Sequence, residues 1–201
     1  MSMVNTRMRV LHSHGMESEH LRATLKGLDR FREFGAFFDV KDITCKGAIR
    51  GVKCGEFIRH TVTAPQTRVT SSLEFRPGFL DGFNDTIGIG VTNRPLQNFD
   101  VITAQPYSTA GVGKFKTGAV ISVAWTRGIT AELVLAGLEL IAAHEVGHLF
   151  IRSKSHCTDS ECIMRESEGM LRLMRRLSQC SRFDFCGSCR EEIAANAKFS
   201  N

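Results

Sequence analysis

Apolar residues recur every three or four positions through residues 20–34, and this spacing predicts an amphipathic helix. The residues that would share its buried face are Leu21, Leu25, Leu28, Phe31 and Phe34. Ser18 is suited to cap the start of this helix, and Gly35 follows its last apolar residue. The pattern therefore predicts a first helix between residues 18 and 35.

A second helical stretch covers residues 131–150 and has a different character. It is apolar almost all round until His144, so we expect it to be the central, buried helix of the molecule. Thr130 is a good residue to cap its start. Two shorter helices are predicted at residues 170–177 and 189–197.

Strands are predicted at residues 7–12, 36–40, 86–91, 98–103 and 119–124. The first two flank the first helix, and this β-α-β order favours a parallel pair. Residues 98–103 have polar ends, which favour a position at the edge of a sheet.

Strands that alternate with helices, followed by helices alone, predict an α/β or α+β fold. The length of 201 residues fits a single domain. We expect its sheet and central helix within residues 1–150, and loops and short helices within 151–201. Residues 41–82 support no firm prediction.

Composition narrows the class of protein. With 42% hydrophobic residues and a net charge of only +5, the chain is too apolar and too weakly charged to be disordered. Residues 133–143 form the longest apolar stretch, which is too short to span a membrane. Residues 1–10 lack the apolar run of a signal peptide. We therefore expect a cytoplasmic protein without a membrane segment. In such a protein, the seven cysteines are expected to be metal ligands or core residues and not disulfide partners.

The sequence His-Glu-Val-Gly-His at residues 144–148 carries the strongest chemical signal. Side chains four residues apart lie on one face of a helix, so His144 and His148 can reach a single Zn²⁺. Glu145 can then act as a general base toward a water that the metal activates.

A catalytic zinc usually has three protein ligands. His156 is the only histidine after the central helix, and we predict that it is the third ligand. Glu166 and Glu168 remain the rival candidates, because some zinc peptidases take their third ligand from a glutamate on a following helix.

Four cysteines have the spacing of a second zinc site. Cys157-x4-Cys162 and Cys186-x-x-Cys189 are separated by about two dozen residues, as the paired ligands of a four-thiolate site often are. We expect the remaining three cysteines to be buried apolar side chains: Cys45, Cys54 and Cys180.

Taken together, these motifs resemble those of the archaemetzincins, a metzincin-clan family of zinc metalloproteases. The resemblance rests mainly on residues 130–190. It implies a mixed twisted sheet, a central helix that carries the active site, and a small C-terminal helical part stapled by zinc. It also implies a catalytic zinc on His144, His148 and His156, Glu145 as general base, a structural zinc on Cys157, Cys162, Cys186 and Cys189, and Met164 in a Met-turn below the catalytic metal.

The sequence departs from the archaemetzincin pattern just after the helix. That family has a glycine three residues after the second histidine, where the chain turns sharply. Ile151 stands at this position, and two extra residues precede His156. A β-branched residue is strongly disfavoured at positive φ, so the helix must end in another way.

The leading functional prediction is a zinc-dependent peptide hydrolase with two zinc ions per chain. Its substrate strand is expected to pair with the sheet edge near residues 98–103. Tyr107 could donate a hydrogen bond to the transition state, although a surface-loop tyrosine is favoured.

Two alternatives remain open. One is a zinc-bound relative of the archaemetzincins with little or no activity. The other, less favoured, is a nucleic-acid-binding zinc module. Its basic residues would be Arg172, Arg175, Arg176, Arg182 and Arg190.

Overall fold

The structure is a computed structural model of the 201-residue chain. It describes residues 6–12, 16–38, 58–63, 70–75, 87–92, 96–99, 106–116, 118–126, 128–152, 156–165, 170–179 and 183–197.

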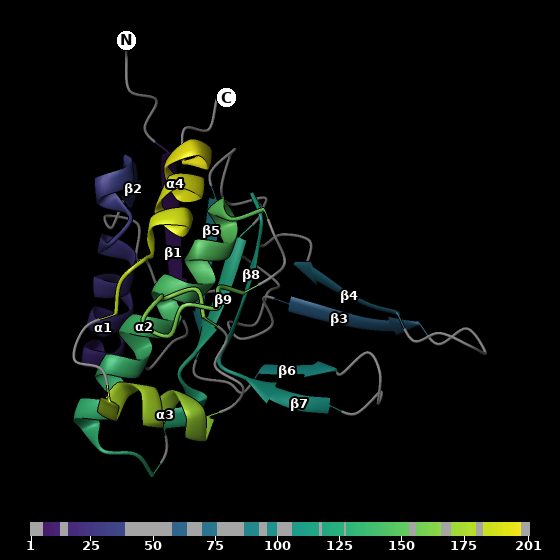
Figure 1. The fold of residues 1–201 in the computed structure, drawn as a ribbon. Helices are drawn as coiled ribbons and strands as arrows, with labels where there is room; N and C mark the ends of the chain where they lie inside the picture. Colours follow the sequence, from purple (N-terminus) through teal and green to yellow (C-terminus); the bar gives the residue numbers. More distant parts are fainter. Residues whose placement is uncertain are drawn as a thin grey trace.

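Five of the described strands form a mixed sheet with strand order β2-β1-β5-β9-β8 (Figure 1). Its strands are β1 (Thr6–His12), β2 (Ala36–Phe38), β5 (Ile87–Thr92), β8 (Gly111–Lys114) and β9 (Gly118–Ser122). All neighbouring pairs are parallel except β8 with β9, which are antiparallel. An antiparallel strand thus occupies one edge of an otherwise parallel sheet.

Helix α1 (Ser18–Asp29) connects β1 to β2, and the β-α-β start predicted from the sequence is confirmed. Ser18 lies within the helix, however, and Glu17 occupies the N-cap position, so the predicted serine cap is wrong. A short 3-10 turn, η1 (Arg32–Phe34), follows the helix. It ends at Gly35, whose φ of 82° is readily adopted only by glycine.

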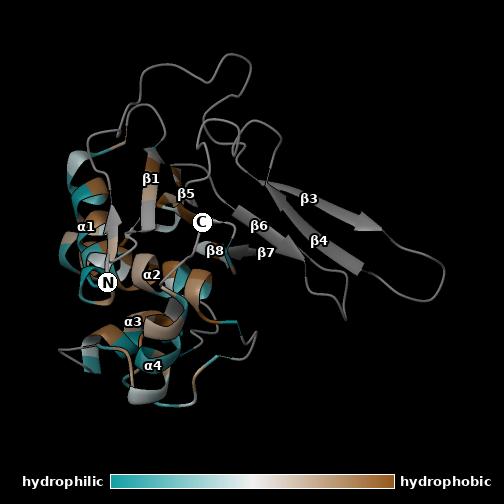
Figure 2. Ribbon diagram, turned by 90° about the horizontal axis from the view of Figure 1, so that it is seen from above, coloured by the Kyte–Doolittle hydropathy of each residue, from teal (hydrophilic) through white to brown (hydrophobic). Residues whose placement is uncertain are grey.

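Helix α2 (Ala131–Phe150) is the central helix, as its apolar sequence predicts, and it starts after Thr130. It packs against α1 and against strands β8 and β9 (Figures 1 and 2). By length and composition alone, α2 could cross a membrane. However, 61% of its most apolar 18-residue window is buried within the protein, as in the core helix of a folded domain.

The C-terminal part contains two short helices, α3 (Met170–Gln179) and α4 (Gly187–Asn196). Helix α4 begins two residues earlier than its sequence pattern predicts. Both helices contact α2. An isolated β-bridge joins Cys162, in the segment between α2 and α3, to Asp184, in the segment just before α4. This bridge holds the C-terminal segments together.

Two hairpins complete the described strands. Strands β3 (Ile58–Thr63) and β4 (Thr70–Phe75) form one antiparallel pair, within the stretch for which the sequence supported no prediction. Strands β6 (Leu96–Phe99) and β7 (Pro106–Thr109) form the other. A second 3-10 turn, η3 (Ala124–Thr126), lies between β9 and α2.

The β6–β7 hairpin corrects two predictions. Strand β6 ends at Phe99 and pairs only with β7, so the described part of residues 98–103 lies outside the five-stranded sheet, and residues 100–105 are not among those described. Tyr107 belongs to β7, opposite Asn98, and not to a loop. The edge strand beside the central helix is β8, whose glycine-rich sequence has little hydrophobic signal.

Candidate metal centres

Three histidines converge at the C-terminal end of α2. His144 and His148 lie one turn apart on the helix, and His156 reaches them from the segment that follows. One ring nitrogen of each lies within 4.8 Å of the corresponding atoms of the other two. The Nε2 atoms of His144 and His148 are 3.2 Å apart. This histidine group therefore unites the three predicted imidazole ligands.

The proton of His144 is positioned by the backbone. Its Nδ1 lies 2.8 Å from the carbonyl oxygen of Ile163, which can only accept, so Nδ1 carries the hydrogen. The Nε2 lone pair then points into the histidine group, the arrangement that metal-binding histidines commonly have. Burial, followed by the neighbouring histidine charges, lowers the pKa of His144 to about 3 and that of His148 to about 4. Both rings are neutral near pH 7, as metal ligation requires.

The side chain of Glu145 extends from α2 toward the edge strand β8. Its side chain packs against Gly111, where any β-carbon would overlap the carboxylate arm. Burial raises the pKa of Glu145 to about 8, and a hydrogen bond from the Gly113 backbone N–H lowers it in part. Gly113 also leaves no space for a side chain, because a Cβ there would overlap the Glu145 carbonyl oxygen and crowd the His148 Cβ. The two glycines thus allow close contact between strand and helix.

Helix α2 ends without the glycine turn of the archaemetzincin pattern. Ile151 has φ −96° and ψ 117°, an extended conformation, and its N–H bonds the carbonyl oxygen of Gly147. Its side chain is buried. The prediction that the helix must end differently is therefore confirmed: the chain leaves α2 as extended backbone that any residue can adopt.

Met164 lies directly under the histidine-bearing turn of α2. It is only 2% exposed, and its sulfur packs where a Cβ of Gly147 would otherwise be. The ring of Phe185 also borders this glycine. Gly147 lies between the two histidines of the His-Glu-Val-Gly-His motif. It is the position on α2 against which the side chains of Met164 and Phe185 pack.

Four cysteines form a second group, the cysteine group. Their sulfur atoms all lie within 4.8 Å of one another. Cys157 Sγ is 3.5 Å from Cys186 Sγ, and Cys162 Sγ is 3.7 Å from Cys189 Sγ. The first two residues come from the loop after α2, and the other two come from the start of α4. Cys162 and Cys189 are buried.

The acidities of these thiols differ within the cysteine group. Burial raises the pKa of Cys162 to about 11, and it also raises the pKa of Cys189. Burial acts the same way on Cys186. There, however, hydrogen bonds from Ser188, from the Cys189 N–H and from Cys157 outweigh it and lower the pKa to about 6.

The donor sets fit zinc in both groups. Three imidazoles with a carboxylate on the residue next to one of them are typical of catalytic zinc sites. Four thiols that converge from two segments match a closed, tetrahedral structural site. Both are candidate zinc sites by the chemistry of their ligand atoms.

Several predicted residues cannot be compared with the structure. Glu166 and Glu168, the rival third ligands, lie outside the described residues, as do Cys45, Cys54, Cys180 and Arg182. Conversely, sequence analysis missed the role of Gly111 and Gly113, although a Gly-x-Gly pair inside a strand indicates a close backbone approach.

The fold is similar to that of solved archaemetzincin structures, and the resemblance predicted from the sequence is confirmed at the level of the fold. No model of a known protein family matches the sequence. No curated protein matches it either.

Three solved structures resemble the chain. The archaemetzincin of Methanopyrus kandleri aligns with a TM-score of 0.60 and 19% identity, over 97% of each chain. The archaemetzincin of Archaeoglobus fulgidus, in complex with malonate, gives 0.55 and 16%, over 93% of this chain and 99% of that one. A zinc-dependent peptidase of Methanocorpusculum labreanum gives 0.53 and 16%, over 92% and 99%. The likeness spans nearly the whole molecule.

Proposed function

We propose that the chain is a zinc-dependent peptide hydrolase that works at the histidine group. The observation that carries the proposal is the convergence of His144, His148 and His156 beside Glu145. The likeness to zinc peptidase structures supports it independently. The cysteine group would hold a second, structural zinc, which makes two zinc ions per chain.

In this proposal, each residue has a separate task. Zinc bound by the three histidines would polarise a peptide carbonyl, acidify a water molecule and, as a nearby cation, favour the ionised form of Glu145. The Glu145 carboxylate takes a proton from the attacking water and passes it to the leaving amine. The N–H of Gly113 fixes the orientation of that carboxylate. Met164 acts as the Met-turn residue, a packing floor below the histidines.

The peptide would bind as an extra strand on β8. This strand is the antiparallel edge of the sheet and runs beside the turn of α2 that carries Glu145. An edge strand aligns a peptide through backbone hydrogen bonds, with little dependence on its side chains. The position revises the initial expectation of an edge near residues 98–103.

The test asks which residue is the third ligand of the catalytic zinc. In this proposal it is His156, and in the rival proposal it is Glu166 or Glu168. We expect His156→Ala to lose one of two zinc ions and to abolish peptide cleavage. The double change Glu166→Gln with Glu168→Gln should keep both. Zinc per chain is measured by elemental analysis, and cleavage by mass spectrometry of a digested peptide library, with and without a chelator. Loss of zinc and activity only in the glutamate variant would reject the assignment of His156.

The same digest tests the main alternative. A zinc-loaded wild-type chain that cleaves no peptide in the library would favour a zinc-binding relative without proteolytic activity.

A further inference from the structure

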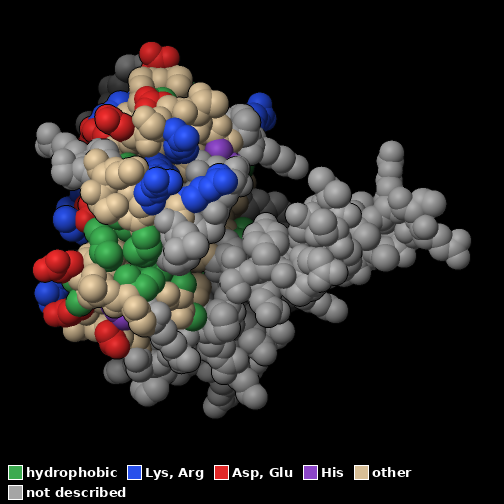
Figure 3. All heavy atoms as spheres, turned by 60° about the horizontal axis from the view of Figure 1, so that its bottom comes forward, with side chains coloured by type: hydrophobic (Ala, Val, Ile, Leu, Met, Phe, Trp, Pro, Cys, Tyr) green, Lys and Arg blue, Asp and Glu red, His purple; other side chains and the backbone are tan. Residues whose placement is uncertain are grey.

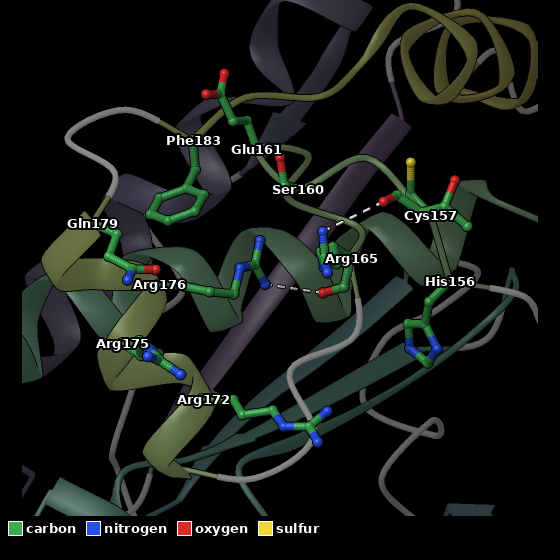
Figure 4. A pocket seen from close by; sticks show the side chains of 11 residues that line it. His156, Cys157, Ser160, Glu161, Arg165, Arg172, Arg175, Arg176, Gln179 and Phe183 are labelled. Carbon is green, nitrogen blue, oxygen red and sulfur yellow. Dashed lines mark hydrogen bonds between the residues drawn. The ribbon is translucent and has the colours of Figure 1, made fainter.

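A cavity of about 860 Å³ adjoins the histidine group on the side of α3 (Figure 4). His156 and Cys157 form one end of its lining. Most of the remainder comes from the segment after Cys157, from α3 and from Phe183. Because His156 belongs both to the histidine group and to this lining, the cavity borders directly on the proposed reaction site. Nothing in the proposed mechanism uses it.

Four arginines line this arginine pocket: Arg165, Arg172, Arg175 and Arg176. Glu161 is the only carboxylate among its described lining residues. Figure 3 shows several Lys and Arg side chains gathered on one face of the molecule, with a histidine beside them. The pocket is therefore strongly electropositive.

Arg176 has a structural role in the pocket. Its Nη1 donates to the carbonyl oxygen of Arg165 at 3.1 Å, and its Nη2 donates to that of Cys162 at 3.0 Å. Its guanidinium also lies over the ring of Phe183, 5.0 Å from the centroid. These contacts fix Arg176 as the floor of the pocket and tie α3 to the segment after the cysteines.

The other arginines are better placed to meet a ligand. Arg172 and Arg175 are exposed on α3, and Figure 4 shows both side chains directed toward the open part of the pocket. No ion pair joins Arg165 or Arg175 to another residue that the structure describes. Three described arginines outside the pocket pair with carboxylates: Arg30 with Glu139, Arg32 with Asp29, and Arg190 with Glu33 and Asp184.

We propose that the arginine pocket binds a carboxylate of the substrate next to the scissile peptide bond. The proposal rests on the proposed peptide hydrolysis, because it uses the histidine group to position the peptide. A planar guanidinium forms paired hydrogen bonds with a carboxylate, which makes arginine the preferred residue for this recognition. The carboxylate is that of an Asp or Glu side chain or of the peptide C-terminus.

A peptide ligand fits these features better than a nucleic acid. Sequence-tolerant binding of single strands uses exposed aromatic faces beside the basic residues. Phe183 is only 8% exposed and is covered by Arg176, so it offers no free face for stacking. The basic residues also converge on one pocket beside His156 and do not follow an extended track.

The test measures binding without cleavage. Zinc-loaded protein carrying Glu145→Gln is titrated into three fluorescent peptides, and dissociation constants are read by anisotropy. The first peptide has one internal Glu and an amidated C-terminus. The second has Gln in place of Glu, and the third is the Gln peptide with a free C-terminal carboxylate. We expect at least one carboxylate peptide to bind about fivefold tighter than the neutral one, as befits a partly exposed ion pair.

Variants of the exposed arginines connect the preference to the pocket. Adding Arg172→Gln and Arg175→Gln should remove the fivefold difference. Arg175→Lys alone should keep part of it. Arg22→Gln is the matched control, because Arg22 is an exposed arginine on α1 outside the pocket lining. Thermal melts establish that each variant is folded.

Three results would overturn the proposal. One is equal affinity for all three peptides. Another is a carboxylate preference that survives the double arginine change, which would place the carboxylate on the metal. The third is displacement of the peptide by a short single-stranded DNA through the same two arginines.

Failure of the pocket and failure of the proposed function give different results. If wild-type protein cleaves no peptide while the arginine-dependent preference is present, the hydrolase proposal fails, and of the pocket proposal only the binding of a peptide carboxylate stands. If wild-type protein cleaves neutral and acidic peptides equally well, the hydrolase proposal stands and the pocket proposal fails.

Discussion

The histidine group and the cysteine group lie side by side, yet they differ in how their ligands are supported. Two of the three histidines share one rigid helix, whereas the four cysteines come in two pairs from separate segments. Disrupting the cysteine group therefore removes a link between two parts of the chain. Disrupting the histidine group leaves the helix intact.

The residues that surround the two groups also differ. The histidine group has a carboxylate beside it and an edge strand along it, whereas the cavity is lined by one residue of each group, His156 and Cys157. The cysteine group has two buried members, and four thiolates would complete a tetrahedral shell. The comparison teaches that three ligands with a neighbouring carboxylate suit a site to chemistry, whereas four ligands that join two segments suit a site to stability.

The largest expected effect comes from Glu145→Gln. Glutamine keeps the size of the side chain but cannot accept the proton, so peptide hydrolysis should fall by about 10²–10⁴-fold while zinc content stays unchanged. The measurement pairs a fluorogenic peptide assay with elemental analysis. Glu139→Gln, the same change on the same helix, serves as control and should leave hydrolysis unaltered. Full activity in Glu145→Gln would remove the distinction between the two groups.

The next effect tests the cysteine group as a structural site. Cys186→Ser should reduce zinc from two ions per chain to one and lower stability by roughly 3 kcal/mol, or about 6–12 °C in melting temperature. At saturating zinc, hydrolysis by the folded fraction should change little. Calorimetry and elemental analysis give the answer. An equally stable variant that lacks this zinc would show that the cysteine group does not support the fold.

A third change tests the close contact between β8 and α2. Gly113→Ala introduces a methyl group against the Glu145 carbonyl and the His148 Cβ, so strand and helix must separate. We expect a loss of about 1–3 kcal/mol in unfolding free energy, together with reduced hydrolysis because Glu145 moves. Denaturant unfolding and the peptide assay measure the two effects.

Gly187→Ala is the control for that change. Apart from the adjoining residues and the backbone of its own helix, no described heavy atom lies within 4 Å of a Cβ at Gly187, which is the first residue of α4. Its stability should stay within about 0.5 kcal/mol of wild type. Equal effects at the two glycines would contradict the tight packing at Gly113.

The smallest effect concerns an ion-pair cluster on α2, away from both groups. Burial raises the pKa of Glu139, but hydrogen bonds and charges from Lys26 and Arg30 outweigh it and hold the pKa below the ordinary value of 4.5. The carboxylate therefore stabilises the fold above about pH 4.5, and this contribution is lost as the pH falls through the lowered value. Glu139→Gln should cost about 1 kcal/mol at pH 7, because the partners are partly exposed.

The pH dependence checks that assignment. Unfolding free energies of wild type and of Glu139→Gln should converge as the pH falls from 7 to 3. Glu132→Gln, which alters an exposed residue in the first turn of α2, should run parallel to wild type. A constant gap between wild type and Glu139→Gln over that range would contradict the lowered pKa.

Sequence alone predicts the histidine group well because its information is local. His144 and His148 are one helical turn apart, and the apolar pattern predicts the helix that carries them. The β-α-β start and the end of α2 at Ile151 follow from equally local rules, namely apolar spacing and the steric cost of positive φ.

The edge strand and the arginine pocket depend on contacts between distant segments. Strand β8 has a glycine-rich sequence because its side chains would collide with α2, and this removes the alternating pattern by which strands are recognised. Arg172 and Arg175 are exposed on α3, and the sequence around them shows only a basic helix face. Only the path of the chain after Cys157 turns that face into the wall of a cavity next to His156.

One consequence follows from the fact that His156 and Cys157 are consecutive residues in different groups. When metal binding at one group fixes its residue of this pair, the backbone of the other residue is fixed as well. Part of the backbone conformational entropy that metal binding costs is therefore lost only once for both groups. In the proposed two-zinc protein, metal binding at the two groups would be reciprocally linked, because occupancy of either would raise the affinity of the other by the same factor. The dipeptide would make the two ions a cooperative pair, in which scarcity of metal empties both sites together.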